Sequence, residues 1–417
     1  MKGNLNRYFQ FLLVVLAAGS IYPLIYLRSN YQESILTVYN ISLERLNGIY
    51  ATLGIAFMVG YFPSGWLADR FSAKKLISFS LLVCGLAGLW FAQTPSYHMV
   101  ILIFVIWGIF SVFTFWAAHL KMVKMIAKNE EQGRFFGMLD GGRGLVEAIL
   151  AIFALFIFQR ILARGTIQES LQGVIYLYSF MMIGVSILIY IFVKDIKPQD
   201  NKQESNQFEK KQKEKFEISH LVDVLKNKYV WLLGLIIFMG YNLAWMLFYL
   251  GGFLQTVVGV DAIRVGQIMV ISLWMRPLGG TSGGFLTDRY NKFRILTIFM
   301  IVSAISLVLF ATLPITAPRL IFYVLVVLIA LTINMVRGIY WSLLSDCKIE
   351  DKILGLSIGF ISLLGYIPDF LAPVVSTVLL TMYGPTAGQS AFFIFGAVMG
   401  IVGVVLVRVF KHQLAGV

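Results

Sequence analysis

The feature that most constrains this chain is a series of twelve apolar runs, each long enough to cross a lipid bilayer as a helix. The hydrocarbon core is about 30 Å thick and a helix rises about 1.5 Å per residue, so a span needs about 20 apolar residues. The runs lack strict apolar–polar alternation and exceed the length of a barrel strand, so we expect helices. The predicted fold class is an all-α membrane protein with 12 transmembrane helices, at residues 8–28, 46–68, 76–94, 98–120, 135–159, 171–193, 229–256, 265–287, 294–314, 319–344, 354–382 and 389–410.

Composition agrees with a chain that has lipid as its solvent. Only 13% of the 417 residues are charged and 59% are hydrophobic, whereas about 25% charged residues is usual in a soluble domain. The net charge of +13 does not indicate nucleic-acid binding here, because positive loops orient membrane proteins. Cys84 lies in an apolar run and Cys347 just after one, which excludes a disulfide framework and a cysteine-based metal site.

The chain divides at its one extended polar segment, residues 194–228, which contains nine lysines and seven acidic residues. This composition predicts a flexible linker, with a short surface helix near residues 216–225. Six apolar runs lie on each side of it. We therefore expect an N-terminal six-helix bundle at 1–193, a cytoplasmic linker at 194–228 and a C-terminal six-helix bundle at 229–417.

Basic residues are distributed unevenly between the loops. With the amino terminus inside, 25 of the 34 Lys and Arg residues fall on the inner side and five on the outer side. Because positively charged loops stay in the cytoplasm, we expect both termini there. The predicted location is the bacterial inner membrane, where the chain is expected to lie in the lipid bilayer as a multi-pass monomer.

One loop motif occurs in each half of the chain. Gly65-Trp66-Leu67-Ala68-Asp69-Arg70 follows the second run, and Gly284-Phe285-Leu286-Thr287-Asp288-Arg289 follows the eighth, 219 residues later. Glycine permits close helix approach in lipid, and the aspartates can pair with basic residues or with a facing helix amino terminus. We interpret the motifs as a conformational latch on the inner side; solvated loop turns are the alternative. The latch residues are Gly65, Asp69, Arg70, Gly284, Asp288 and Arg289.

These motifs resemble the signature loop of the major facilitator superfamily, Gly-x-Leu-x-Asp-Arg-x-x-x-Lys/Arg. The resemblance covers essentially the whole chain. That family has two parallel halves related by an axis along the membrane normal. The resemblance therefore implies two pseudo-symmetric six-helix bundles that rock around a central substrate site.

A second resemblance concerns the first run. Tyr26-Leu27-Arg28-Ser29-Asn30-Tyr31 is similar to the first-helix segment of the organophosphate:phosphate antiporter family, whose arginine there binds the substrate phosphate. The second phosphate arginine of that family, in the seventh span, has no counterpart around residues 241–245. The resemblance therefore implies a broader class, an organic-anion transporter.

Ionisable side chains within the runs are candidates for a substrate site, because each costs about 2.5–3.5 kcal/mol to insert. The planar fork of Arg28 suits a carboxylate, phosphate or sulfonate, although so long a side chain can also reach the membrane surface. At an offset of 218 residues Arg337 corresponds to His119, which favours a site lined by both halves; hydrogen bonding between helices is the alternative. The predicted substrate-binding residues are Tyr26, Arg28, His119, Trp245, Arg276, Asn334 and Arg337.

Asp140, Arg143 and Glu147 lie at positions i, i+3 and i+7, on one helical face. One interpretation is a structural ladder in which Arg143 is the ion-pair partner. The other is proton transfer, with Glu147 as the first candidate because it lies near mid-bilayer. Asp140 and Asp369 are further proton-coupling candidates, and Asp369 is alternatively a gate at the outer end.

The leading hypothesis is a secondary active transporter for a small organic anion such as a sugar phosphate, sulfonate or carboxylate, coupled to protons or driven by exchange. No Walker-type phosphate loop is present, so ATP-driven transport by this chain is not expected. No nucleophile–base pair or metal-ligand cluster is visible among the four histidines, so we expect neither an enzyme nor a cofactor or metal. The alternatives are a drug:proton exporter of the same superfamily, a transporter-like metabolite sensor and a lipid flippase.

Overall fold

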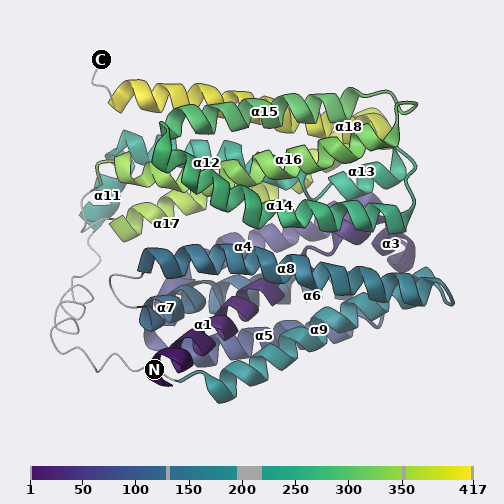
Figure 1. The fold of residues 1–417 in the computed structure, drawn as a ribbon, viewed down its shortest axis with the longest axis horizontal. Helices are drawn as coiled ribbons and strands as arrows, with labels where there is room; N and C mark the ends of the chain where they lie inside the picture. The colour runs from purple at the N-terminus through teal and green to yellow at the C-terminus, as the bar shows by residue number, and fades with distance from the viewer. Residues whose placement is uncertain (1, 128–131, 195–217, 350–353, 415–417) are drawn as a thin grey trace.

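The computed structural model describes residues 2–127, 132–194, 218–349 and 354–414. Within these ranges the chain is helical and contains no strand. The helices form two groups, one before and one after the segment 195–217, which lie side by side with roughly parallel axes (Figure 1). Both chain ends lie at one end of this arrangement, which we call the terminal end; the opposite end is the far end (Figure 1).

The helices of the two groups have the following bounds. The first group contains α1 (Lys2–Ser20), α2 (Tyr22–Ile25), α3 (Arg28–Tyr39), α4 (Leu43–Arg70), α5 (Ala73–Phe91), α6 (Tyr97–Gly108), the π-helical turn η1 (Ile109–Thr114), α7 (Trp116–Ile126), α8 (Gln132–Leu162) and α9 (Ile167–Phe192). The second contains α11 (Ile218–Lys226), α12 (Lys228–Met246), α13 (Leu250–Thr256), α14 (Ala262–Arg289), α15 (Lys292–Thr312), α16 (Arg319–Tyr340), the 3₁₀ turn η3 (Trp341–Asp346), α17 (Leu354–Gly365) and α18 (Pro368–Leu414).

The duplicated motif produces the same local structure twice. α4 ends at Arg70 and α14 at Arg289, and the chain then turns in an extended conformation into a capped helix. The Ser72 hydroxyl accepts a hydrogen bond from the backbone of Lys75, and the Asn291 side chain accepts one from the backbone of Arg294. A side-chain oxygen at this position satisfies an amide that has no partner within the helix, so both turns are encoded locally.

The first span differs from its prediction, because Arg28 lies inside it rather than at its end. The helix breaks at residue 21 and again near Tyr26, where Pro23 occupies the start of α2, and it resumes as α3. The whole stretch Asn6–Tyr39 has 34 residues. At about 1.5 Å per residue it is longer than the hydrocarbon core.

The observed helices are consistent with the twelve predicted runs. Among the described residues, nine stretches are long and apolar enough to cross a membrane. One of them, Ser357–Leu414, has 58 residues and is interrupted at Gly384, whose φ is +81°, so it contains the eleventh and twelfth runs. The second and eighth runs, α4 and α14, have 28 residues each and fall outside the nine.

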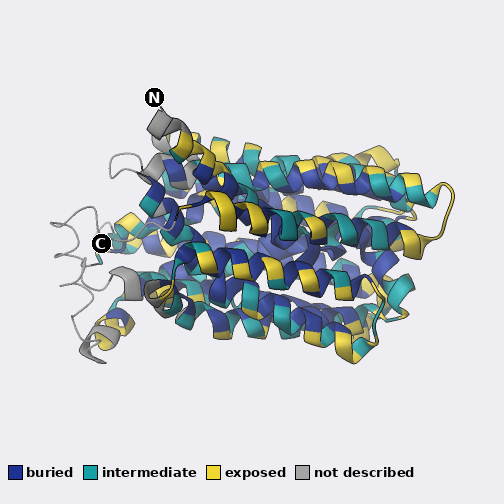
Figure 2. Ribbon diagram, turned by 90° about the horizontal axis from the view of Figure 1, so that it is seen from below, coloured by how far each residue is buried: buried dark blue, intermediate teal, exposed yellow. Residues whose placement is uncertain are grey.

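Apolar side chains fill the interior, and many large apolar residues are also exposed. Figure 2 shows buried and exposed positions alternating along the helices. Trp107 and Phe310 are fully buried, whereas Phe153, Phe180 and Val324 are more than half exposed. Soluble monomers rarely expose such extended apolar surface. The exposed residues are therefore the lipid-facing surface of the helices, and the predicted all-α membrane fold is confirmed.

The two groups contact each other through α4 with α18, α8 with α14, and α3 with α13. A Cβ added to Gly54 of α4 would lie 2.6 Å from the backbone nitrogen of Phe370 in α18, and one added to Gly251 of α13 would lie 2.5 Å from the carbonyl oxygen of Ser29. Such backbone approach is possible only at glycine. Since α3 and α13 lie at the far end (Figure 1), the groups are joined there.

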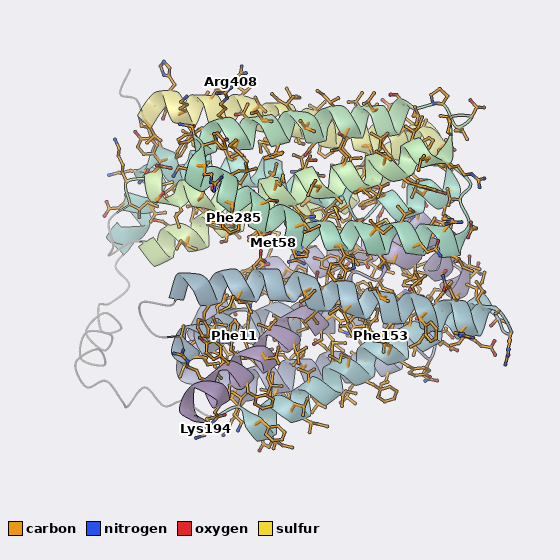
Figure 3. The ribbon with its side chains drawn as sticks, in the orientation of Figure 1. Phe11, Met58, Phe153, Lys194, Phe285 and Arg408 are labelled. Atoms are coloured by element: carbon orange, nitrogen blue, oxygen red, sulfur yellow. The ribbon has the colours of Figure 1, made fainter. Side chains whose placement is uncertain are left out.

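Toward the terminal end the same helices separate. Gly65 of α4 has no heavy atom within 4 Å of an added Cβ, and Phe285 of α14 is 72% exposed. Figure 3 shows Met58 and Phe285 near the border between the two groups. The structure is therefore closed at the far end, whereas Gly65 of α4 has no helix packed against it at the terminal end.

We predict that Gly54→Ala separates the two groups at the far end, because its Cβ overlaps the backbone of α18. Spin labels on Arg164→Cys and Thr316→Cys, with Cys84 and Cys347 replaced by serine, should report a longer distance by electron paramagnetic resonance. Gly65→Ala on the same helix is the matched control and should leave the distance unchanged, since its Cβ meets nothing. A Gly54→Ala distance equal to that of the unsubstituted protein would show that the contact does not hold the groups together.

Candidate functional site

A cavity of about 1000 Å³, counting the part open to solvent, lies between the two groups. Helices of both groups supply its wall, in which aromatic side chains are the most common kind and a few side chains are charged. The charged residues are Arg143, Glu147, Arg276, Arg337 and Asp369, and the aromatic residues are Tyr22, Tyr26, Phe57, Tyr61, Trp116, Tyr178, Tyr241, Phe248 and Tyr366. An apolar cavity with a few convergent polar groups is the usual form of a small-molecule site.

One carboxylate in the wall is shared by two arginines from different groups. Glu147 Oε1 lies 3.1 Å from Nε of Arg143, one turn earlier on α8, and Oε2 accepts a hydrogen bond from Nη1 of Arg276 on α14. The side chains of Glu147, Arg143 and Arg276 are only 10%, 16% and 15% exposed. Removal from water strengthens such charge pairs, so Glu147 ties the two groups together beside the cavity.

Glycine brings α14 close enough for this contact. A Cβ added to Gly144 of α8 would lie 3.2 Å from Cδ of Pro277 and 3.4 Å from Cδ of Arg276. Small residues at such positions allow helices to pack tightly in lipid. Asp140 also approaches Arg276, at 3.8 Å from Nη2, but its side chain is 70% exposed and the pair is correspondingly weak.

Arg337 of α16 is the third guanidinium group in the wall. Unlike Arg143 and Arg276, it forms no ion pair with any carboxylate in the described part of the chain. The wall thus holds three arginines and two carboxylates, and one arginine has no counter-charge in contact. A guanidinium fork in a partly buried wall is suited to a carboxylate, phosphate or sulfonate.

Asp369, in the first turn of α18, is the second carboxylate and is 2% exposed. Its Oδ1 accepts hydrogen bonds from the Tyr241 hydroxyl at 2.7 Å and from the Trp245 indole nitrogen at 3.2 Å. Both donors come from α12. Trp245 does not line the cavity. It donates a hydrogen bond to Asp369, which does line the cavity.

Aromatic rings extend across the border between the groups. Tyr26 of the first group stacks on Phe248 at 4.5 Å between ring centroids and meets Trp245 edge-on at 6.2 Å. The ring centroid of Tyr366 lies 4.8 Å from that of Tyr241 and 5.9 Å from that of Tyr61. The predicted site residue Tyr26 is thus a wall residue that contacts the opposite group.

Arg28 lies outside the cavity wall, at the far-end junction. It is fully buried and donates to Oδ1 of Asn47 at 2.9 Å, to Oε1 of Gln32 at 2.8 Å and to the hydroxyl of Tyr249 at 3.3 Å. Its guanidinium carbon is 4.0 Å from the centroid of the Tyr249 ring. Asn47 also donates to Ser376 of α18, at 3.1 Å, so this network joins the two groups.

Two other predicted residues are buried away from the cavity. His119 stacks on Phe115, 4.8 Å between centroids, and its Nδ1 lies 3.3 Å from the Phe115 carbonyl oxygen. Asn334 donates to the carbonyl oxygen of Ala330 at 2.8 Å. Each side chain thus has a hydrogen-bond partner in the backbone four residues earlier.

The latch residues lie at the terminal ends of α4 and α14. Gly65 is exposed and has no helix packed against it, so the close approach expected there is absent from this conformation. Arg289 is exposed. The remaining latch side chains, Asp69, Arg70, Gly284 and Asp288, lie outside the described residues.

The sequence names Arg143 as an ion-pair partner on the same helix as Glu147, but it does not reveal the partners that come from other helices. Tyr241 lies 128 residues from Asp369, and Arg276 lies 129 residues from Glu147. The far-end partners Asn47, Gln32 and Tyr249 were also missed. Tyr249 lies in an apolar stretch, but Gln32 and Asn47 lie in polar stretches that do not distinguish them from their neighbours.

This arrangement, a cavity with a few charged groups between two helical groups that are closed at one end, indicates the class of protein. The model of the Major Facilitator Superfamily matches residues 8–373. The chain belongs to this family and is a multi-pass membrane protein of the secondary-transporter class rather than an enzyme. No cluster of three or more metal-ligating side chains occurs among the residues that the structure describes.

Similar proteins agree with this assignment. The chain is 28% identical to Inner membrane protein YqcE of Escherichia coli K12 over 404 residues, which cover 95% of this chain and 93% of YqcE. It is 26% identical over 363 residues to Inner membrane protein YihN of the same organism, covering 86% and 84%. A mutant of the nucleoside transporter NupG has the same fold, with a TM-score of 0.75 at 15% identity, covering 97% of this chain and 99% of NupG.

We predict that Glu147→Gln destabilises the protein more than Arg276→Gln does. Loss of the shared carboxylate leaves Arg143 and Arg276 facing each other without a counter-charge, whereas loss of Arg276 leaves Glu147 paired with Arg143. Breaking a buried ion pair costs about 3–5 kcal/mol, and solvent in the cavity should reduce this value. Midpoints of thermal unfolding in detergent measure the difference, with the exposed Arg408→Gln as control. An Arg276→Gln midpoint below that of Glu147→Gln contradicts the sharing of the carboxylate.

Proposed function

We propose that the protein transports a small organic anion by alternating access. The observation that carries this proposal is the cavity wall, where Arg337 has no carboxylate in contact and stands near two further arginines. A phosphate, sulfonate or carboxylate would supply the missing charge. Arg143, Arg276 and Arg337 are the residues proposed to hold it, with Tyr26 contributing to the wall.

We also propose proton coupling through Glu147. This carboxylate occupies the guanidinium groups of Arg143 and Arg276, so an incoming anion competes with it. Protonation of Glu147 removes its charge and frees both arginines for substrate, which makes proton and anion binding mutually favourable. The charged and titratable groups around it are Arg143 and Asp140 on its own helix, Tyr22 on α2, Tyr178 on α9, Arg276 on α14, Arg337 on α16 and Asp369 on α18.

The orientation is proposed from the charge bias. Basic loops place the terminal end in the cytoplasm, and the names of YqcE and YihN support an inner-membrane location. The far end, which is closed here, would then face outward. Arg28 would hold the outer side shut in this state and could meet an anion only when its contacts with Tyr249 and Asn47 open.

The domain division and the latch complete the proposal. Residues 1–193 and 229–417 are proposed to move as two bundles joined by the linker 194–228. In the alternative state the glycines of the two motifs would allow close helix approach at the terminal ends of α4 and α14, with Asp69 and Asp288 each pairing with a basic residue or with a facing helix amino terminus. The exposed Gly65 of the present state supports such a movement.

A drug:proton exporter is the second candidate function. Its support is the aromatic wall around Asp369, which suits an apolar cation. The three arginines oppose it, because a cation would have to enter beside them.

For the anion site, we expect phosphorylated, sulfonated or carboxylated metabolites to raise the thermal unfolding midpoint of the purified protein, because a ligand of the folded state stabilises it. Arg337→Gln should abolish the rise caused by every hit, and the exposed Arg408→Gln should retain it. Stabilisation by hydrophobic cations alone, with no response to anions, would favour the exporter instead.

For proton coupling, Glu147→Gln in proteoliposomes should lose accumulation driven by a pH gradient but retain exchange of substrate across the membrane. A permanently neutral side chain cannot carry the proton, yet it leaves the arginines free. Asp140→Asn should retain gradient-driven uptake because its side chain is largely exposed. Full gradient-driven uptake by Glu147→Gln would remove this residue from the coupling step.

A further inference from the structure

Asp369 is a buried carboxylate in the cavity wall that contacts no cation. Its two hydrogen-bond donors, Tyr241 and Trp245, are both neutral, and both bind the same oxygen, Oδ1. Among the described residues, none donates to Oδ2 and none forms an ion pair with this side chain. The second oxygen is therefore available to an occupant of the cavity.

Burial makes the missing counter-charge important. Asp369 is 2% exposed, and an ionised carboxylate out of water is strongly disfavoured unless it is paired. The titratable groups that face it from other helices are tyrosines and one arginine: Tyr22 of α2, Tyr26 between α2 and α3, Tyr61 of α4, Tyr241 of α12, Arg337 of α16 and Tyr366 between α17 and α18. Of these only Arg337 is cationic, and it lies beyond ion-pair distance.

The surroundings of Asp369 are aromatic. Tyr241 and Tyr366 meet edge-on, and Tyr26 and Phe248 stack beside the Trp245 ring that holds the carboxylate. Ring faces attract cations, most strongly an ammonium group removed from water. A carboxylate set among such rings is a recognised environment for an ammonium ion, and a neutral hydroxyl would leave its charge uncompensated.

The wall carries charges of both signs, supplied by different helices. Arg143, Arg276 and Arg337 come from α8, α14 and α16, whereas Asp369 comes from α18, and all four line one cavity. We infer that the substrate is a zwitterion, whose acid group binds the arginines and whose ammonium group binds Asp369 within the aromatic rings. This inference rests on the proposed anion site and adds the cationic group to it.

The experiment uses matched probes on the full-length protein in detergent. For each acid group (phosphate, sulfonate and carboxylate) three forms of one short alkyl chain are compared, ending in an amine, a hydroxyl or a methyl group, together with the alkylamine that lacks the acid. Affinity is measured by calorimetric titration. For at least one acid group, we expect the probe that ends in an amine to bind about tenfold or more tightly than the probe that ends in a methyl group. This ratio corresponds to about 1.4 kcal/mol.

The variant Asp369→Asn keeps the shape of the side chain and removes its charge. It should reduce the preference for the amine to about twofold or less while the methyl form binds as before. Arg337→Gln should weaken all three forms of a probe together. The comparison between amino and methyl forms in the unsubstituted protein tests the inference even if a variant fails to fold.

The outcomes are distinct. Equal affinity of the amino, hydroxyl and methyl forms overturns the zwitterion and leaves the anion site in place, with Asp369 as a proton site. If the alkylamine without an acid group binds as tightly as the amine-terminated acid, the zwitterion is overturned in favour of a cation site. Failure of every acid-bearing probe overturns the anion proposal and this inference with it.

Discussion

The structure depends on how ionised side chains in a low-dielectric interior find their counter-charges. Glu147 is the counter-charge of two arginines, Arg143 on its own helix and Arg276 in the opposite group. Because the carboxylate cannot be removed without exposing two like charges to each other, it both joins the groups and sets the charge of the cavity. Any anion that enters must compete with it.

The two contacts between the groups differ in kind. At the far end Arg28 is held by neutral acceptors and by aromatic rings, without a carboxylate. Beside the cavity the contact is a charged pair, Arg276 with Glu147. Opening the far-end junction separates no pair of opposite charges, whereas moving Arg276 away from Glu147 does. In the proposed mechanism the far-end junction would act as the gate, and the pair beside the cavity would couple proton and anion binding.

Close helix approach positions both contacts. Gly54 lets the backbones of α4 and α18 touch near Asp369, and Gly144 lets α14 bring Arg276 to Glu147. In lipid there is no hydrophobic force between helices, so tight packing at small residues carries much of their association. The exposed Gly65 shows the opposite condition, a small residue with no helix against it.

The sequence by itself determined the helical class, the apolar runs, the polar segment that divides them and the family, because these follow from local hydrophobic patterns and a duplicated motif. It also identified Glu147, Arg276, Arg337 and Asp369, since a charge within an apolar run is visible without a structure. Which charge meets which was decided only by the tertiary structure. The hydrogen bond between Trp245 and Asp369 joins residues that are 124 positions apart. It depends on how the helices pack, and no local pattern encodes that packing. Arg28 shows the same limit: its chemistry was evident, but its place at the far-end junction followed from a helix that continues beyond it.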